Sequence, residues 1–304
     1  MPVIEVANLR KTYGRLTAVE DVSFGVEEGE IFGILGPNGA GKTTTVECIA
    51  GLRRADAGTV RVLGLDPGRA QDRDELHQSV GVQLQESGLP DKIKVSETLD
   101  VFGSFYRKPA DADALLAELG LSERADARYR KLSGGQKQRL AIALALIGEP
   151  RVLILDELTT GLDPHARRDV WDLVERIRDR GVTILLVTHF MQEAERLCDR
   201  LALIDRGRVV AVDTPAGIAA LSGVGQRMRF RPSTPVAADD LLALPEVSSV
   251  ERHGPYIVAV GSGDLVQAVT SLLARRQIIA ADLRIEQNTL DDAFVTLTTH
   301  TTQD

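Results

Sequence analysis

The segment that decides the fold is ILGPNGAGKTTTVECIAG, residues 34–51. Gly36 to Thr43 fits the pattern G-x-x-x-x-G-K-[ST]. It lies between a short apolar run and a predicted helix, the setting in which this pattern marks a phosphate-binding loop. Its glycines let backbone N–H groups surround phosphates, Lys42 supplies a positive charge near the β- and γ-phosphates, and the Thr43 hydroxyl can bind Mg²⁺. We therefore expect a buried strand, a nucleotide-binding loop and a helix that ends near Gly51.

A second part of the same site is predicted in RVLILDE, residues 151–157. Its apolar run indicates a buried strand, and the strand ends in Asp156 and Glu157. Ligand groups gather at the carboxyl ends of strands in open α/β sheets. We expect Asp156 to hold Mg²⁺ through water and Glu157 to orient or deprotonate an attacking water.

A further helix start that suits an anion lies in KLSGGQKQRL, residues 131–140. Ser133 and two glycines come directly before a predicted helix that begins at Gln136. Backbone N–H groups at a helix start are unpaired, and the helix dipole favours negative charge there. The chain thus has two helix starts suited to phosphate, and the second has no lysine or metal ligand of its own.

Apolar strand patterns alternate with helical patterns up to about residue 220. IFGILG and VTILLVTH are typical of buried strands, and helices follow them. Two hairpins are expected, one at Glu28–Gly29 and one at Arg206–Gly207. Alternating strands and helices with apolar strands predict an α/β core with a largely parallel sheet.

The pattern changes after the segment SGVGQ, residues 222–226. The elements that follow are expected in the order βαββαβ, which is the ferredoxin-like plan, with a last helix capped by Thr289. We therefore predict a first domain over residues 1–222 and a small C-terminal α+β accessory domain over residues 223–304.

Composition limits the classes of function. The chain has 304 residues, 43% of them apolar, and a formal net charge of -8, which argues against a dedicated nucleic-acid binder. Its two cysteines, Cys48 and Cys198, are expected to be buried reduced thiols. The N-terminus has no signal-peptide pattern, and no apolar run reaches the roughly 18 residues that could span a bilayer. We expect a cytoplasmic protein that can dock onto a membrane partner.

Three more motifs identify a family. LSGGQ precedes the strand that ends in Asp156, TTGLDP follows it, and LLVTH ends the next strand at His189. With the phosphate loop, these motifs resemble the ATP-binding subunits of ABC transporters over about residues 3–220. The resemblance implies a P-loop NTPase core of the α/β class, with an antiparallel β subdomain and a helical subdomain at about residues 88–135. It also implies ATP and Mg²⁺ as cofactors.

The resemblance implies partners as well. Two copies would face each other head to tail, so that each LSGGQ segment binds the γ-phosphate of the ATP held by the other copy. An integral-membrane permease would be the second partner, which places the chain peripherally on the cytoplasmic face of the cell membrane. Nucleic acid is not expected as a partner.

The resemblance also assigns roles residue by residue. Tyr13 would stack on adenine, His189 would contact the γ-phosphate, and Asp163 would lie at the dimer interface. Gln85 would reach Mg²⁺ and water, with Gln83 as a rival in the same stretch. The remaining nucleotide-binding residues would be Gly36, Pro37, Asn38, Gly39, Ala40, Gly41, Lys42, Thr43 and Thr44 in the phosphate loop, and Ser133, Gly134, Gly135 and Gln136 in the signature.

One departure and one alternative remain. The family usually has proline after the Asp–Glu pair, where this chain has Leu158, so we expect slightly looser positioning of Glu157. The ending TLDDAFVTLT resembles daunorubicin-type drug-resistance exporter ATPases, which favours export of a drug-like or lipophilic cargo. The alternative is a soluble ABC ATPase of DNA repair or translation. Such chains usually carry a second cassette or a long coiled-coil insert, and neither pattern is found here.

Overall fold

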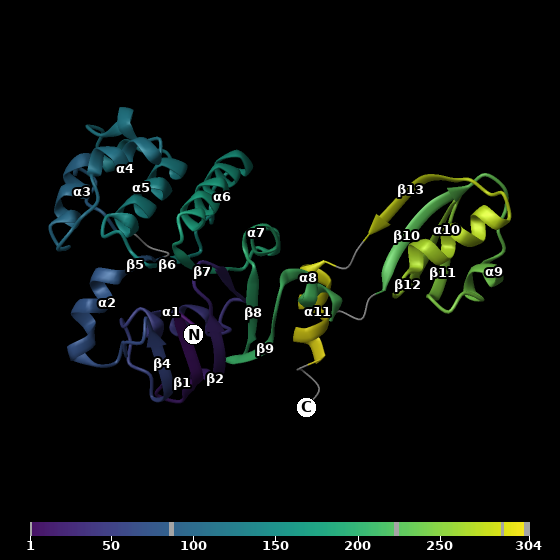
Figure 1. Ribbon diagram of the computed structural model, residues 1–304, viewed down its shortest axis with the longest axis horizontal. Helices are drawn as coiled ribbons and strands as arrows, with labels where there is room; N and C mark the ends of the chain where they lie inside the picture. Colours follow the sequence, from purple (N-terminus) through teal and green to yellow (C-terminus); the bar gives the residue numbers. More distant parts are fainter. Residues whose placement is uncertain (1, 85–87, 222–224, 287–288, 301–304) are drawn as a thin grey trace. The chain divides into compact units, whose positions relative to one another are not determined.

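A computed structural model of the chain describes residues 2–84, 88–221, 225–286 and 289–300 (Figure 1). The chain divides into two compact units, Met1–Pro215 and Ala216–Asp304. The boundary predicted from the sequence, between residues 222 and 223, lies after helix α8 (Pro215–Ala220) rather than at its start. No helix in these described ranges is both long enough and apolar enough to cross a bilayer.

The first unit is built on a mixed nine-stranded sheet with the order β4-β1-β2-β9-β8-β3-β7-β6-β5. Its strands are β1 (Ile4–Tyr13), β2 (Leu16–Val26), β3 (Ile31–Leu35), β4 (Ala57–Val62), β5 (Val80–Gln83), β6 (Val152–Asp156), β7 (Thr183–Thr188), β8 (Arg200–Asp205) and β9 (Arg208–Asp213). The run from β8 through β3, β7 and β6 to β5 is parallel, and β1 pairs antiparallel with β2 and β4. The predicted α/β class with an antiparallel β subdomain is confirmed.

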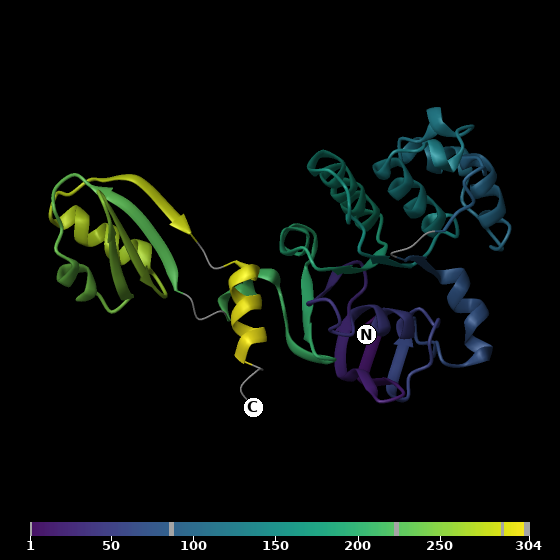
Figure 2. The ribbon, with the colours of Figure 1, turned by 180° about the vertical axis from the view of Figure 1, so that it is seen from behind.

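Seven α-helices precede α8 in the described residues of this unit. They are α1 (Lys42–Ile49), α2 (Arg73–Ser79), α3 (Val95–Gly103), α4 (Ala112–Glu118), α5 (Gly134–Leu146), α6 (Pro164–Asp179) and α7 (Met191–Leu197). Figures 1 and 2 show α3, α4 and α5 gathered together beyond the β5–β6 side of the sheet. Helices α3 and α4 fall in the helical segment expected at about residues 88–135, while α5 begins at Gly134 and extends beyond that range to Leu146.

The central strands are buried on both faces. Every residue of β3, β6 and β7 is buried, so each strand reads as a continuous apolar run rather than an alternating one. These three strands lie side by side and parallel, which brings their carboxyl ends to one edge of the sheet. Candidate site residues that follow β3, β6 and β7 are therefore placed close together.

The hairpin predicted at Glu28–Gly29 is wrong. Strands β2 and β3 are not neighbours, because β2 lies between β1 and β9 while β3 lies between β8 and β7. The buried run of β3 pairs with other buried strands instead of folding back on the half-exposed β2. The actual hairpin joins β1 to β2 through Gly14 and Arg15, with Tyr13 opposite Leu16. The second predicted hairpin is confirmed, since Asp205 pairs with Arg208.

The second unit contains a four-stranded antiparallel sheet with the order β11-β12-β10-β13. Its elements are α8, β10 (Gln226–Pro232), α9 (Ala238–Leu242), β11 (Val247–His253), β12 (Tyr256–Gly261), α10 (Leu265–Arg275), β13 (Ala280–Glu286) and α11 (Leu290–His300). Helices α9 and α10 cover one face of the sheet (Figure 1), and Met228, Phe230 and Ile257 are buried there. The strand order is that of the ferredoxin-like plan, as predicted. Thr289 caps α11 by accepting a hydrogen bond from Asp292 N at 3.2 Å.

Candidate nucleotide site

The predicted phosphate loop joins β3 to α1. Gly41 has a φ of 100°, and a Cβ there would lie 2.4 Å from the carbonyl oxygen of Ala18, so only glycine fits without displacement. Helix α1 begins at the next residue, Lys42, which is only 5% exposed. Its Nζ donates hydrogen bonds to the carbonyl oxygens of Gly36 at 2.8 Å and of Pro37 at 3.0 Å. The first two residues of the loop therefore hold the ammonium group of Lys42 through their carbonyl oxygens.

Burial changes the pKa of Lys42. Desolvation lowers the pKa of its ammonium group, and the nearby carboxylates of Glu157 and Asp156 oppose that shift. Backbone carbonyls carry no full charge, so they compensate a buried ammonium only in part. A polyphosphate in the loop would give this cation the anionic partner that the two carbonyls do not supply.

A pocket of about 450 Å³ opens beside this loop. Its lining residues are Tyr13, Leu16, Thr17, Ala18, Asn38, Gly39, Gly41, Lys42, Thr43, Thr44 and Glu157. Tyr13 is 38% exposed, and two cations lie near its ring, Lys11 Nζ at 5.7 Å and Arg53 Cζ at 5.4 Å from the centroid. The structure therefore brings the predicted adenine platform and the predicted phosphate loop to one pocket.

Asp156 fits a divalent cation. It is 1% exposed, and neither of its carboxylate oxygens has a hydrogen-bond partner within the described part of the chain. Burial, reinforced by the neighbouring carboxylate of Glu157, raises the pKa of Asp156 to about 6. Mg²⁺ prefers carboxylate and hydroxyl oxygens, and it would relieve both the missing bonds and the charge repulsion. Asp156 at the end of β6 and Thr43 on α1 are the residues that would hold it.

Glu157 and His189 lie together at the ends of the adjacent strands β6 and β7. His189 Nδ1 is 3.1 Å from Glu157 Oε1. With the carboxylate ionised, Nδ1 carries the proton of this hydrogen bond, and the other ring nitrogen is left for a ligand. Thr160 donates to the second oxygen of Glu157 at 3.4 Å. Glu157 and His189 were predicted to contact the ligand separately. In the structure their side chains also contact each other.

The signature segment and Asp163 do not line this pocket. Ser133 caps α5 by accepting a hydrogen bond from Gln136 N at 3.3 Å, and it is exposed. Asp163 caps α6 by accepting hydrogen bonds from the backbone of Ala166 and His165, which hold the pKa of its carboxyl below the usual range. Both groups stand at helix starts, apart from the nucleotide pocket of their own chain.

Gln85 lies outside the described residues. Its rival Gln83 is described and is 4% exposed, at the end of β5. Gln83 Nε2 donates to the carbonyl oxygen of Leu84 at 2.7 Å, and its Oε1 is buried with no hydrogen-bond partner in the described ranges. The choice between the two glutamines therefore stays a prediction.

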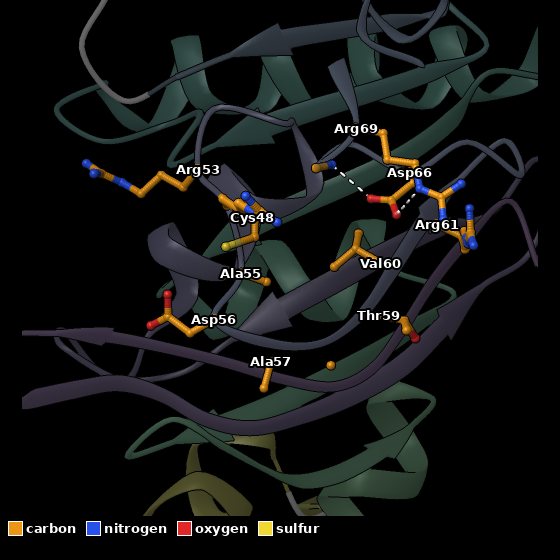
Figure 3. Close-up of a pocket in the computed structure, with 13 residues that line it drawn as sticks. Cys48, Arg53, Ala55, Asp56, Ala57, Thr59, Val60, Arg61, Asp66 and Arg69 are labelled. Atoms are coloured by element: carbon orange, nitrogen blue, oxygen red, sulfur yellow. Dashed lines mark hydrogen bonds and ion pairs between the residues drawn. The ribbon is translucent and has the colours of Figure 1, made fainter. Parts of the chain in front are cut away.

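A second pocket, of about 350 Å³, lies on the antiparallel part of the sheet (Figure 3). Four of its charged side chains, Arg53, Asp56, Asp66 and Arg69, form ion pairs with one another or with close neighbours. Arg69 pairs with Asp66 at 3.3 Å, Arg53 pairs with Glu47, and Lys11 pairs with Asp56 at 2.8 Å. Cys48, which also lines this pocket, is buried, and burial raises the pKa of its thiol to about 11, so it is not a nucleophile at neutral pH.

Comparison with known proteins now identifies the family. A family model described as ABC transporter matches residues 19–160. The chain is 41% identical to the Nod factor export ATP-binding protein I of Paraburkholderia xenovorans, over 99% of this chain and 98% of that protein. The chain belongs to the ATP-binding subunits of ABC transporters. The protein of the same name from Ralstonia nicotianae is 46% identical to this cassette over 70% of the chain and 68% of that protein.

Solved structures agree with this assignment. A cassette from Clostridium perfringens, described as part of an ABC transporter complex, superimposes with a TM-score of 0.66 and 28% identity over 72% of this chain and 91% of that one. A bacterial ABC transporter cassette solved as a dimer superimposes with a TM-score of 0.62 and 27% identity over 69% of this chain and 98% of that one. The cassette is an ATPase whose activity is coupled to transport.

Three further residues line the candidate nucleotide pocket and were not predicted from the sequence. Leu16, Thr17 and Ala18 line it together with Tyr13. The signal was present, because a tight turn at Gly14 returns the chain beside Tyr13. With the first hairpin predicted at Glu28–Gly29, residues 16–18 were not expected to lie beside Tyr13.

Tyr13→Ala is expected to weaken ATP binding by about 10-fold, because base–aromatic stacking contributes about 1–3 kcal/mol. Tyr13→Phe keeps the ring and should bind as the wild type does. Calorimetric titration with ATP and with inorganic tripolyphosphate separates the causes. An equal loss for tripolyphosphate, which has no base, would refute the stacking role.

Asp156→Asn is expected to stabilise the nucleotide-free cassette in EDTA at pH 8. The pKa of Asp156 rises from 3.8 to about 6 on folding, so between these values the folded state holds a proton that the unfolded state has lost. Stability therefore falls as pH rises through this window and is lowest above it. Removing the charge should return up to about 3 kcal/mol at pH 8 and nothing near pH 3.5. Thermal unfolding at both pH values, with exposed Asp100→Asn as control, measures this; equal shifts at the two pH values would contradict it.

Proposed function

We propose that the cassette powers export through a separate integral-membrane permease, by ATP-driven dimerisation of two copies. The observation that carries the proposal is the similarity to a Nod factor export ATP-binding protein over 99% of the chain. That similarity includes the C-terminal unit as well as the ATPase core. The proposed location is peripheral, on the cytoplasmic face of the cell membrane.

The proposed roles follow from the pocket. Lys42 and the phosphate loop bind the phosphates of ATP, and Tyr13 stacks on the adenine. Thr43 and Asp156, with Gln85, hold Mg²⁺, which neutralises phosphate charge when bound. Glu157 orients or deprotonates the attacking water, while His189 contacts the γ-phosphate. The pocket lining and the buried carboxylate of Asp156 support these roles.

The signature and Asp163 are proposed to act in the second copy. Ser133 and Gly134 are exposed at the start of α5, where a helix start can bind an anion. They do not line their own chain's pocket, which is what a site completed by a partner requires. Two symmetric composite sites would then form in the dimer. Among the similar structures, one cassette was solved as a dimer in a post-hydrolysis state with ADP and phosphate.

The cargo proposed from the sequence is drug-like or lipophilic, by resemblance to daunorubicin-type exporters. The relatives reported above are named for export of Nod factor, and their names do not mention drug resistance. They agree with export, and the cargo class rests on the resemblance of the C-terminal ending alone. They do not favour the alternative role in DNA repair or translation.

The proposal is tested by capturing the permease. Tagged Glu157→Gln protein, which is expected to retain ATP and stay dimeric, is incubated with ATP and detergent-solubilised membranes of the source cells. Mass spectrometry of the bound fraction should identify a polytopic membrane protein. Lys42→Ala, which is not expected to bind ATP, serves as the control for ATP-dependent capture. Recovery of only ribosomal or DNA-repair proteins would overturn the proposal.

A further inference from the structure

A buried carboxylate outside the nucleotide pocket joins three segments of the first unit. Glu193, on α7, is 0% exposed. Its Oε1 accepts a hydrogen bond from Thr159 Oγ1 at 2.8 Å and another from Trp171 Nε1 of α6 at 2.8 Å. Its Oε2 is buried with no hydrogen-bond partner in the part of the chain that the structure describes. Burying a carboxylate with an unpaired oxygen costs free energy of folding, which suggests a role other than stability for Glu193.

The segments that Glu193 joins carry the two residues at the proposed centre of hydrolysis. Thr159 is the second residue after Glu157, and α7 begins at Met191, the second residue after His189. One oxygen atom therefore holds the turn that carries Glu157 against the helix that follows His189. The distance between those two side chains, 3.1 Å from Oε1 to Nδ1, depends on how these segments are held.

The backbone of the turn at Glu157 has an unfavourable conformation. Glu157 has a φ of 50°, in the left-handed region that costs a residue with a side chain of order 1 kcal/mol and persists only where the surroundings impose it. The next residue is Leu158, which is fully buried but has no ring to restrict the backbone. The hydrogen bond from Thr159 to Glu193 adds a side-chain restraint to this turn, beside the backbone hydrogen bonds from Glu157 N to Val187 O at 2.9 Å and from Thr160 N to Glu157 O at 3.3 Å.

We propose that Glu193 is a positioning residue for ATP hydrolysis. Its carboxylate fixes the turn after β6 and the start of α7 to each other, and so sets the geometry of Glu157 and His189. It does not touch the nucleotide. The inference rests on the proposed role of Glu157 and adds to it a residue that no motif in the sequence indicated.

Other contacts hold α6 against α7 when Glu193 is changed. Arg196 of α7 forms an ion pair with Asp172 at 2.5 Å and another with Glu175 at 3.5 Å, both on α6. Its guanidinium also lies 5.4 Å from the ring centre of Trp171. Loss of the Glu193 carboxylate should therefore loosen the turn at Thr159 more than it separates the helices.

The test measures steady-state hydrolysis of MgATP by the full chain. Glu193→Ala is expected to lower kcat by about 10- to 100-fold, the effect of a small misplacement of reacting groups, while KM for ATP stays near the wild-type value. Thr159→Val, which replaces the hydroxyl with a methyl group and so removes the hydrogen bond to Glu193, should lower kcat by about 10-fold in the same way. Glu193→Gln keeps an oxygen acceptor for both donors and should restore kcat to near the wild-type value. Glu195→Ala, an exposed change on the same helix, is the control.

The outcomes separate this inference from the proposed function. Wild-type kcat in Glu193→Ala and Thr159→Val with only a lower Tm would make Glu193 a purely structural residue. Equal damage from Glu193→Gln and Glu193→Ala would also overturn the inference. If Glu193→Ala does not fold, Thr159→Val and Glu193→Gln still decide it. Glu157→Gln is assayed in parallel, because a wild-type rate in that variant would refute the proposed function itself.

Discussion

Replacing Lys42 with alanine should weaken ATP binding by at least about 100-fold, because each hydrogen bond to a charged group contributes about 1.5–3 kcal/mol. Lys42 is the buried cation of the phosphate loop, and its Nζ donates hydrogen bonds to the carbonyl oxygens of Gly36 and Pro37. Phosphate oxygens carry full charge and would replace these weaker acceptors. Calorimetric titration with MgATP gives the affinity directly.

The same variant separates binding from folding. Burial lowers the pKa of Lys42, which means that the folded chain holds its charge at a cost. Removing the side chain should therefore leave the Tm of the nucleotide-free protein near the wild-type value, while ATP should no longer raise it. Lys92→Ala, an exposed change in the helical segment, is the control for loss of one positive charge. ATP affinity within the error of the wild type in Lys42→Ala would refute the assigned role.

The positions of the candidate nucleotide-binding residues in the fold could be predicted from the sequence because the signals are local. Lys42 follows β3 after the phosphate loop, Asp156 is the last residue of β6, and His189 directly follows β7. Parallel strands place their carboxyl ends at one edge of the sheet. A motif and an apolar run are then enough to assign a position in space. The ferredoxin-like order of the C-terminal sheet was predicted from a different signal, the order βαββαβ of its elements along the chain.

Contacts between distant residues could not be predicted in this way. Glu193 lies in MQEAERL, where the other acid, Glu195, is exposed, and nothing along the chain indicates that Glu193 is buried. Its partners Thr159 and Trp171 come from other elements. The pairing of β1 with β2 was missed for a related reason: Gly14 and Gly29 both look like turn residues, and only the packing of β3 between β8 and β7 decides between them.

Replacing Glu157 with glutamine should lower kcat for ATP hydrolysis by about 10²- to 10⁴-fold, the usual contribution of a general base or water-orienting group. Glutamine keeps the size of the side chain and an acceptor for the hydrogen bond from His189 Nδ1, so the local structure should persist. It removes the charge and the basicity that an attacking water needs. ATP affinity should be retained, since Lys42, Tyr13 and the loop are unchanged. Single-turnover kinetics with radiolabelled ATP measures the chemical step apart from product release.

The trapped state gives this prediction a second measurement. If hydrolysis opens the dimer, Glu157→Gln with ATP should elute as a dimer in gel filtration, whereas wild-type protein should return to the monomer as ATP is consumed. Combining Glu157→Gln with Lys42→Ala should abolish the dimer, because the ATP that joins the two copies no longer binds. Glu195→Gln, the same chemical change at an exposed position, should behave as the wild type does. A wild-type hydrolysis rate in Glu157→Gln would remove Glu157 from the chemistry. A slow variant that stays monomeric with ATP bound would keep its chemical role but refute ATP-driven dimerisation of the chain on its own.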